Sequence, residues 1–145
     1  MEFKSIEDLA ENFRYEISFE RPWLFVIAQD EKKRLEGCSA VKRELELGLE
    51  ESKSAGKIKE YDVRISDLKG KVPKMDLEFD ILWRTIGKNK GKLFIPIFHN
   101  ADDWSFLPQM AFDDEIPGIF SVSNQGYSRV INSSKRDCYH TLRLN

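Results

Sequence analysis

The sequence has little of what membrane spans, disulfide frameworks and common catalytic motifs require. Its longest apolar run covers 23–28, far short of the ~20 residues that a bilayer span needs. Its two cysteines, Cys38 and Cys138, lie far apart without metal-ligand spacing, which predicts two reduced, partly buried thiols. It contains no phosphate-binding glycine loop, nucleophile elbow or zinc-protease motif. These absences favour a non-enzymatic protein with no catalytic residue, cofactor or metal.

The composition indicates one folded, soluble domain. A length of 145 residues is close to the commonest domain size, so we expect a single domain over 1–145. An aromatic content of 12% is too high for a disordered chain, and a charged content of 33% is too high for a membrane protein. The first eight residues lack the basic and apolar segments of a signal peptide, which favours a cytoplasmic protein that contacts no membrane.

Hydrophobic periodicity predicts an α+β fold. Two helices are expected in the first sixty residues, one capped by Ser5 and one beginning at Ser39 and stopped by Gly56, with a surface turn over 29–37 before the second. The expected strands cover 23–28, 61–65, 75–86, 93–98, 118–122, 126–131 and 138–144. Two hairpins, 75–86 with 93–98 and 118–122 with 126–131, predict a mainly antiparallel arrangement of about five to seven strands in one or two sheets. Pro96 indicates an edge position or a bulge.

Basic residues are missing from one long stretch of the chain. Residues 93–128 contain no Lys or Arg, although 23 of the 145 residues are basic. The same stretch carries aromatic residues and five carboxylates, and its candidate interface residues are Asp102, Asp103, Trp104, Phe106, Asp113, Asp114 and Glu115. Aromatic anchors ringed by carboxylates suit a protein interface, because buried rings supply affinity and charges steer association. The alternative is a long loop whose aromatic side chains pack back onto the sheet.

Three more carboxylates alternate along one expected strand. Asp76, Glu78 and Asp80 share a face of the segment 75–86, about 6.5–7 Å apart. They fit the solvent face of a half-covered strand, an acidic stripe that meets a basic partner, or a divalent-metal site of a hydrolase. No Lys or His is placed beside them by a recognisable motif, so the metal interpretation has the least support.

The two histidines do not define a catalytic pair. His140 alternates with apolar residues, which predicts a hydrogen-bonded core or half-buried side chain. His99 precedes a polar loop and could act as a general base, but nothing in the sequence singles out a nucleophile for it. The lysines lie in loops with few aromatic residues among them, so single-stranded nucleic acid is an improbable partner. A small nucleic-acid-binding or regulatory module nevertheless remains the alternative function.

The acidic, motif-poor character of the chain resembles that of bacterial immunity proteins, in particular those of contact-dependent growth inhibition systems. The resemblance is carried by the segment 75–83 and by the acidic stretch 102–115. It implies a non-enzymatic inhibitor that binds its cognate toxin domain in the cytoplasm. Many such toxins are nucleases with basic surfaces, which an acidic inhibitor would approach quickly and block. The ten interface residues named above would then contact the toxin.

Overall fold

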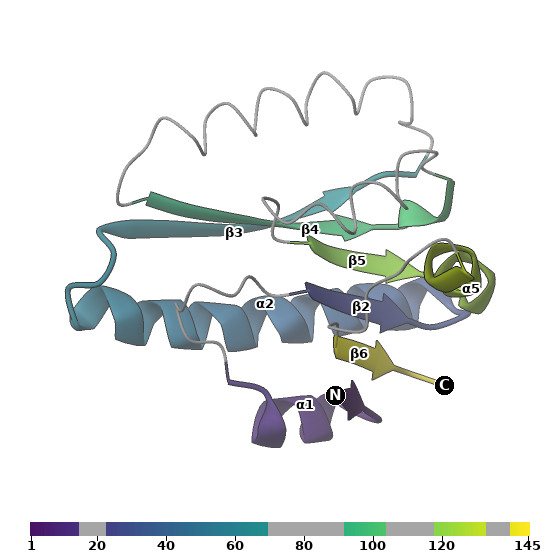
Figure 1. Ribbon diagram of the computed structural model, residues 1–145, viewed down its shortest axis with the longest axis horizontal. Coiled ribbons are helices and arrows are strands. Elements are labelled where there is room, and N and C mark those ends of the chain that lie inside the picture. The colour runs from purple at the N-terminus through teal and green to yellow at the C-terminus, as the bar shows by residue number, and fades with distance from the viewer. Residues whose placement is uncertain (15–22, 70–91, 104–117, 133–139) are drawn as a thin grey trace.

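The computed structural model describes residues 1–14, 23–69, 92–103, 118–132 and 140–145 (Figure 1). Three helices lie in these ranges: α1 (Ile6–Asn12), α2 (Glu31–Ser54) and α5 (Asn124–Asn132). The strands are β1 (Glu2–Phe3), β2 (Trp23–Ile27), β3 (Glu60–Asp67), β4 (Lys92–His99), β5 (Gly118–Val122) and β6 (His140–Arg143), with a short 3-10 turn, η1 (Ala101–Asp103), after β4. Of the helices in these ranges, none combines the length and apolar character needed to cross a bilayer.

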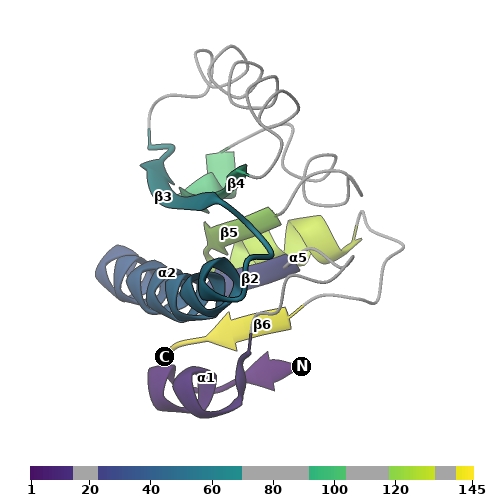
Figure 2. The ribbon, with the colours of Figure 1, turned by 90° about the vertical axis from the view of Figure 1, so that its left-hand side faces the viewer.

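The strands form one sheet in the order β1-β6-β2-β5-β4-β3, and every described pairing is parallel. The prediction of a mainly antiparallel sheet is therefore wrong. Figure 2 shows α2 and α5 on opposite faces of the sheet, with α1 beside α2 near β1. Helices on both faces bury parallel strands completely, which explains the unbroken apolar run of β2. The predicted strand over 23–28 is confirmed as β2, and residues 24–28 are all buried.

Of the two predicted hairpins, the one over 118–122 and 126–131 is wrong, and the other pairs 93–98 with a segment that lies outside the described residues. The segment 93–98 falls within β4, which pairs in parallel with β3 along its whole length and with β5 at Ile97 and Phe98. The strand as a whole lies between β3 and β5 and is interior, but Pro96 comes just before the β5 pairing begins, where β3 is the only described neighbour of β4. The segment 126–131 is helical and belongs to α5, because the Ser123 hydroxyl accepts the Gly126 N–H at 3.2 Å as an N-cap. The proposed strand 75–86 lies outside the described residues.

Helix α2 begins eight residues before the predicted start at Ser39. Asp30 caps it by accepting the Lys32 N–H at 2.8 Å, so the expected surface turn forms its first turns. The sequence suggested a turn because this segment is highly charged, yet only one face of the helix is polar. The other face packs on the sheet through Arg34, Gly37, Cys38, Ala40, Val41, Leu45, Leu49 and Ser52. Gly56, with φ of 77°, stops the helix as predicted.

Alternation along the strands divides the side chains of the sheet between its two helical layers. Leu24, Val26, Val63, Ile95, Ile97 and Ile119 belong to the core cluster that includes the buried residues of α2. On the α5 side, the ring centroid of Phe120 lies 5.9 Å from that of Phe25 and 5.4 Å from that of Phe98, and Tyr127 packs against Phe25. Phe98 and Phe120 come from the stretch without Lys or Arg, so these two of its rings are core and not surface.

Candidate cation site at the carboxyl edge of the sheet

The parallel strands bring polar residues together where β3, β4 and β5 end. Asp67 and His99 are register partners at the ends of β3 and β4, and Ser121 lies near the end of β5. Their side chains continue the rows that face α2, and Glu31 opens that helix directly after β2. We call this side of the sheet the carboxyl edge. In open parallel sheets the region outside the carboxyl ends of the strands is where ligands bind.

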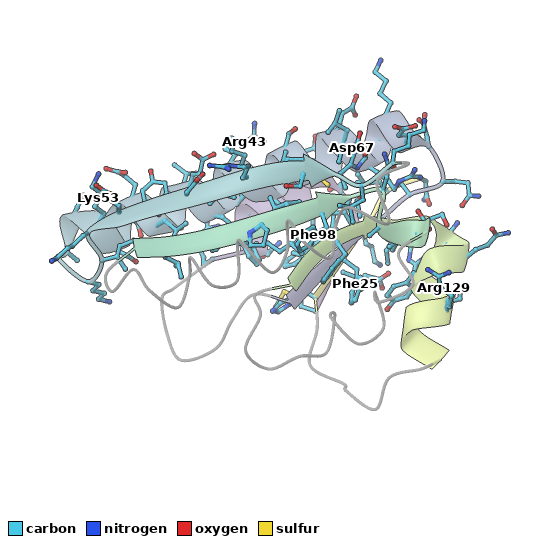
Figure 3. The ribbon with its side chains drawn as sticks, turned by 90° about the horizontal axis from the view of Figure 1, so that it is seen from above. Phe25, Arg43, Lys53, Asp67, Phe98 and Arg129 are labelled. Carbon is cyan, nitrogen blue, oxygen red and sulfur yellow. The ribbon has the colours of Figure 1, made fainter. Side chains whose placement is uncertain are left out.

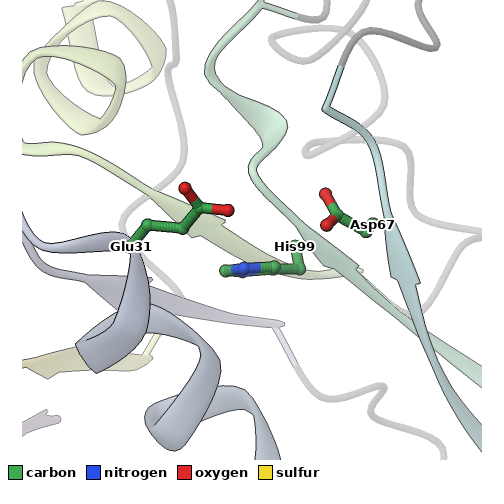
Figure 4. Close-up of side chains that lie close together, drawn as sticks. All are labelled: Glu31, Asp67 and His99. Atoms are coloured by element: carbon green, nitrogen blue, oxygen red, sulfur yellow. The ribbon is translucent and has the colours of Figure 1, made fainter.

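Glu31, Asp67 and His99 converge at this edge (Figure 4). One potential ligand atom from each side chain lies within 4.8 Å of the other two. His99 is only 2% exposed, whereas both carboxylates reach solvent. The three side chains line an open pocket of about 500 Å³, together with Asp30, Lys32, Leu35 and Ile65. A buried imidazole and two ionisable carboxyl groups therefore face one accessible volume.

Asn100 joins the two carboxylates. Its Nδ2 donates to Glu31 Oε1 at 3.1 Å and to Asp67 Oδ1 at 3.0 Å, while its Oδ1 accepts from Arg34 at 2.9 Å. An arginine side chain can only donate hydrogen bonds, so the orientation of the Asn100 amide is fixed. The residue also has a φ of 58°, in the left-handed region that asparagine tolerates better than most residues. Asn100 is thus a bridge that holds the two acids together.

Arg34 holds Asn100 in place. Its guanidinium is buried, with 8% of the residue exposed, and it also donates to the carbonyls of Ala28 at 2.8 Å and Gln29 at 2.9 Å. These bonds tie α2 to the segment between β2 and the helix as well as to Asn100. Arg34 therefore holds Asn100 in place but is not itself one of the residues that line the pocket.

His99 is held by the neighbouring strand. Its Nδ1 lies 2.7 Å from the Ser121 hydroxyl, which also accepts the Asn100 N–H at 2.9 Å. Burial lowers the pKa of His99 below its ordinary value, although the Asp67 carboxylate opposes that effect. The imidazole is therefore neutral at pH 7 and can serve as a base or as a metal ligand.

Both carboxyl groups are ionised at neutral pH. The pKa of Glu31 is lowered by the hydrogen bond from Lys69, whose Nζ lies 3.1 Å from Oε2, and also by the bond from Asn100. Burial acts to raise the pKa of Asp67, but hydrogen bonds from the Lys69 N–H and from Asn100 outweigh it and lower the pKa. Glu31 and Asp67 therefore both carry negative charge beside the pocket, and the exposed ammonium of Lys69 lies next to Glu31.

Cys38 does not add a nucleophile to the site. Burial raises the pKa of its thiol to about 12, although a hydrogen bond with Ser121 lowers it slightly. The thiol is thus protonated and inert at neutral pH. Cys38 is a free, buried cysteine, which confirms the prediction of a reduced thiol for this residue, whereas Cys138 lies outside the described residues.

The residues predicted as an interface are for the most part not described. Asp76, Glu78, Asp80, Trp104, Phe106, Asp113, Asp114 and Glu115 lie outside the described residues, and Asp103 is placed only as part of η1. The Asp102 carboxylate accepts the Ser123 N–H at 2.8 Å and the Ser123 hydroxyl at 2.6 Å, and Arg129 donates to the Asp102 carbonyl. Figure 3 shows Arg129 on α5 and Asp67 beside α2. Asp102 is therefore used inside the fold, at the start of α5.

Sequence reasoning missed Glu31, Asp67, Asn100 and Arg34 as site residues and considered His99 only as an isolated base. A usable signal was present, because Asp67 comes two residues after the alternating Tyr61, Val63 and Ile65, and His99 directly follows the apolar segment 93–98. Once β3 and β4 are parallel, those positions meet. His140, predicted to be half-buried, is partly buried and packs near Phe3 and Phe13.

Comparisons with known proteins do not identify a relative. No protein-family model matches the chain, and searches of curated proteins and of solved structures found no match either. The chemistry of the site must therefore be inferred from its own residues. Two carboxylates and a neutral imidazole suit a positively charged ligand, because they offer negative charge and lone pairs toward one pocket.

Proposed function

We propose that this protein is a binding domain whose carboxyl-edge pocket accepts a positively charged ligand. The observation that carries the proposal is the convergence of Glu31, Asp67 and the buried His99 on one accessible pocket. One positive group already binds there, because the Lys69 ammonium lies 3.1 Å from the Glu31 carboxylate. Its ion pair with Glu31 is exposed, with 69% and 45% of the two side chains accessible. Exposed ion pairs contribute little stability, so an external cation can replace this one.

A test compares binding of cationic probes by wild-type protein and by the double variant Glu31→Gln/Asp67→Asn. The probes are Mn²⁺, spermine and a hexa-arginine peptide, each titrated calorimetrically at low salt. We expect at least one probe to bind wild type and to lose about tenfold in affinity in the variant, a change of roughly 1.4 kcal/mol. The matched control, Glu11→Gln/Glu36→Gln, removes two exposed carboxylates elsewhere and should bind as wild type does. If no probe binds, or if both double variants lose affinity equally, the proposal is wrong.

The charge distribution of the chain favours a second candidate, the inhibitor of a basic nuclease-type toxin domain that the resemblance implies. Residues 93–128, which contain no Lys or Arg, supply most of β4 and all of β5 and so contribute to the carboxyl edge. On this proposal the protein is a non-enzymatic, cytoplasmic immunity protein, and a basic side chain of the toxin enters the pocket. Asp102 is a poor contact for such a toxin, because Ser123 already occupies one of its carboxylate oxygens.

The second candidate is tested with the product of the neighbouring gene. An immunity protein is expected to form a stable complex with the toxin domain encoded beside it, and to abolish its nuclease activity at a one-to-one ratio. The Glu31→Gln/Asp67→Asn variant should associate more slowly, most visibly at low salt, because steering by charge acts on the association rate. A neighbouring gene product that neither binds the protein nor loses activity in its presence would eliminate this candidate.

A further inference from the structure

The carboxyl-edge pocket combines one nitrogen donor with two oxygen donors. Carboxylates are sufficient to recognise a basic side chain, so the imidazole is the feature that narrows the choice of cation. A neutral imidazole beside carboxylates is instead a common ligand set for first-row transition metals, whereas Ca²⁺ and Mg²⁺ prefer sites made only of oxygen. The donor set therefore distinguishes between the kinds of cation that the pocket could hold.

His99 supplies an observation that is independent of the acidic residues. Only 2% of the residue is exposed, yet it is one of the residues that line the pocket. Its Nδ1 lies against the Ser121 hydroxyl, and no described residue hydrogen-bonds its other ring nitrogen. The Ser121 hydroxyl also accepts the Asn100 N–H. In the tautomer in which Nδ1–H donates to the Ser121 hydroxyl, the lone pair of Nε2 is free for a ligand.

We infer that the cation in this pocket is a divalent transition-metal ion, held by Glu31, Asp67 and His99, and that Lys69 occupies the Glu31 carboxylate when no metal is bound. The inference rests on the proposed function and specifies its ligand. The Ser121 hydroxyl is the outer partner that orients the imidazole, as metal-bound histidines require. Asn100 and Arg34 fix the spacing of the two acids without being ligands themselves.

The distances require only small movements. Ligand atoms around a tetrahedral ion with bonds of 2.0–2.2 Å lie about 3.4 Å apart, whereas the three atoms here lie within 4.8 Å of one another. His99 is fixed by burial, but the side chains of Glu31 and Asp67 reach solvent and can rotate toward it. Lys69 must leave Glu31 as the ion enters, because two cations cannot share that carboxylate at close range. With three protein ligands, at least one coordination position faces the pocket, as in catalytic and not structural metal sites.

Lys69 provides a sharp test, because removing a competing cation should strengthen metal binding. Chelator-treated protein is titrated with Mn²⁺ and with Zn²⁺ by calorimetry at pH 7. We expect wild type to bind one equivalent, Asp67→Asn and Glu31→Gln to lose at least about tenfold in affinity, and Lys69→Met to gain about threefold to tenfold. Lys57→Met removes an exposed lysine that precedes β3, whereas Asp67 ends that strand, and should leave metal affinity within about twofold of wild type.

Several outcomes would overturn the inference. It fails if wild type binds neither metal, if the carboxylate variants bind as tightly as wild type, or if Lys69→Met binds more weakly. Thermal unfolding of each variant shows whether it folds, and Lys69→Met keeps the test decisive if Asp67→Asn does not. A hexa-arginine peptide that binds wild type at Glu31 and Asp67 when neither metal does would overturn the inference and leave the proposed function standing. Absence of binding by spermine, the peptide and both metals would overturn both.

Discussion

The two ends of the carboxyl edge use the same kind of side chain in different ways. At the β3–β4 end, Asp67 closes a strand and shares the Asn100 amide with Glu31 beside an open pocket. At the β5–α5 end, Asp102 follows β4 and accepts two hydrogen bonds from Ser123 where α5 begins. Both residues are carboxylates placed at or just after the ends of parallel strands, yet the first lines an open pocket whereas the second is hydrogen-bonded to Ser123.

The difference lies in the partners of each carboxylate. Asp102 is bonded to a backbone N–H and to the hydroxyl that caps α5, and neither partner can leave without damage to the helix start. Gly126 packs so closely that a Cβ there would collide with the Asp102 carboxylate. Glu31 is instead paired with an exposed lysine, which another cation can replace. Asp67 also accepts a backbone N–H, from Lys69, so it differs from Asp102 in the open pocket that it lines and in its neighbour Glu31.

The largest effect on stability is expected from Arg34→Ala at the β3–β4 end. The substitution leaves the carbonyls of Ala28 and Gln29 and the Oδ1 of Asn100 without their charged donor. We expect the free energy of unfolding to fall by about 3 kcal/mol in urea denaturation, together with a loss of cation binding, because Asn100 is released. Arg64→Ala removes an exposed arginine paired with Asp62 and should cost less than about 1 kcal/mol. Equal losses in the two variants would show that Arg34 does not organise the site.

A smaller effect, confined to the other end, is expected from Asp102→Ala. It removes the acceptor of the Ser123 N–H and hydroxyl, so the free energy of unfolding should fall by roughly 1–2 kcal/mol. Cation affinity should remain unchanged, whereas Asp67→Asn should reduce cation affinity with less effect on stability. Calorimetric titration and urea denaturation of both variants give these two readouts. The comparison would be broken if Asp102→Ala weakened cation binding as much as Asp67→Asn does.

The smallest effect is a pH dependence that belongs to the β3–β4 end. Because burial lowers the pKa of His99, the unfolded chain takes up a proton near pH 6.5 while the folded protein resists it. Stability should therefore decline as pH falls from about 7.5 to 5.5, and should not depend on this group at higher pH. Glu31 and Asp67 have lowered pKa values, so their contribution is lost only at more acidic pH. The melting temperatures of chelator-treated wild type and His99→Gln are measured between pH 5.5 and 7.5. A wild-type melting temperature that does not change with pH, or the same pH dependence in both proteins, would contradict the account.

Local features of the fold were predictable, and long-range pairing was not. The apolar run of β2, the alternation of Tyr61, Val63 and Ile65 in β3, and the Ser5 cap of α1 all depend on neighbouring residues, and the structure has each of them. The direction in which β4 pairs depends on where the chain goes after β3, which periodicity cannot reveal. A short turn signal at 123–125 suggested a hairpin, but Ser123 caps a helix instead.

The site depends on this unpredictable pairing. Asp67 and His99 are register partners only because β3 and β4 are parallel; an antiparallel hairpin would have placed the ends of its strands at opposite edges. Glu31 joins them because α2 begins at residue 31, in a segment whose charge resembles that of a surface turn. Charge patterning alone drew attention to Asp102 instead, since it cannot show which carboxylates are bonded inside the fold.

Paramagnetic broadening of backbone amide signals by Mn²⁺ tests most directly where the cation binds. Substoichiometric Mn²⁺ is added to ¹⁵N-labelled, chelator-treated protein, and the loss of each assigned signal is measured. The account predicts that five signals broaden first, those of Glu31, Asp67, Leu68, His99 and Asn100. The signals of Ser123, which is hydrogen-bonded to Asp102, and of α5 should persist longer. Broadening that centres on Ser123 and α5, or that spreads evenly over exposed carboxylates, would show that the β3–β4 end is not the cation site.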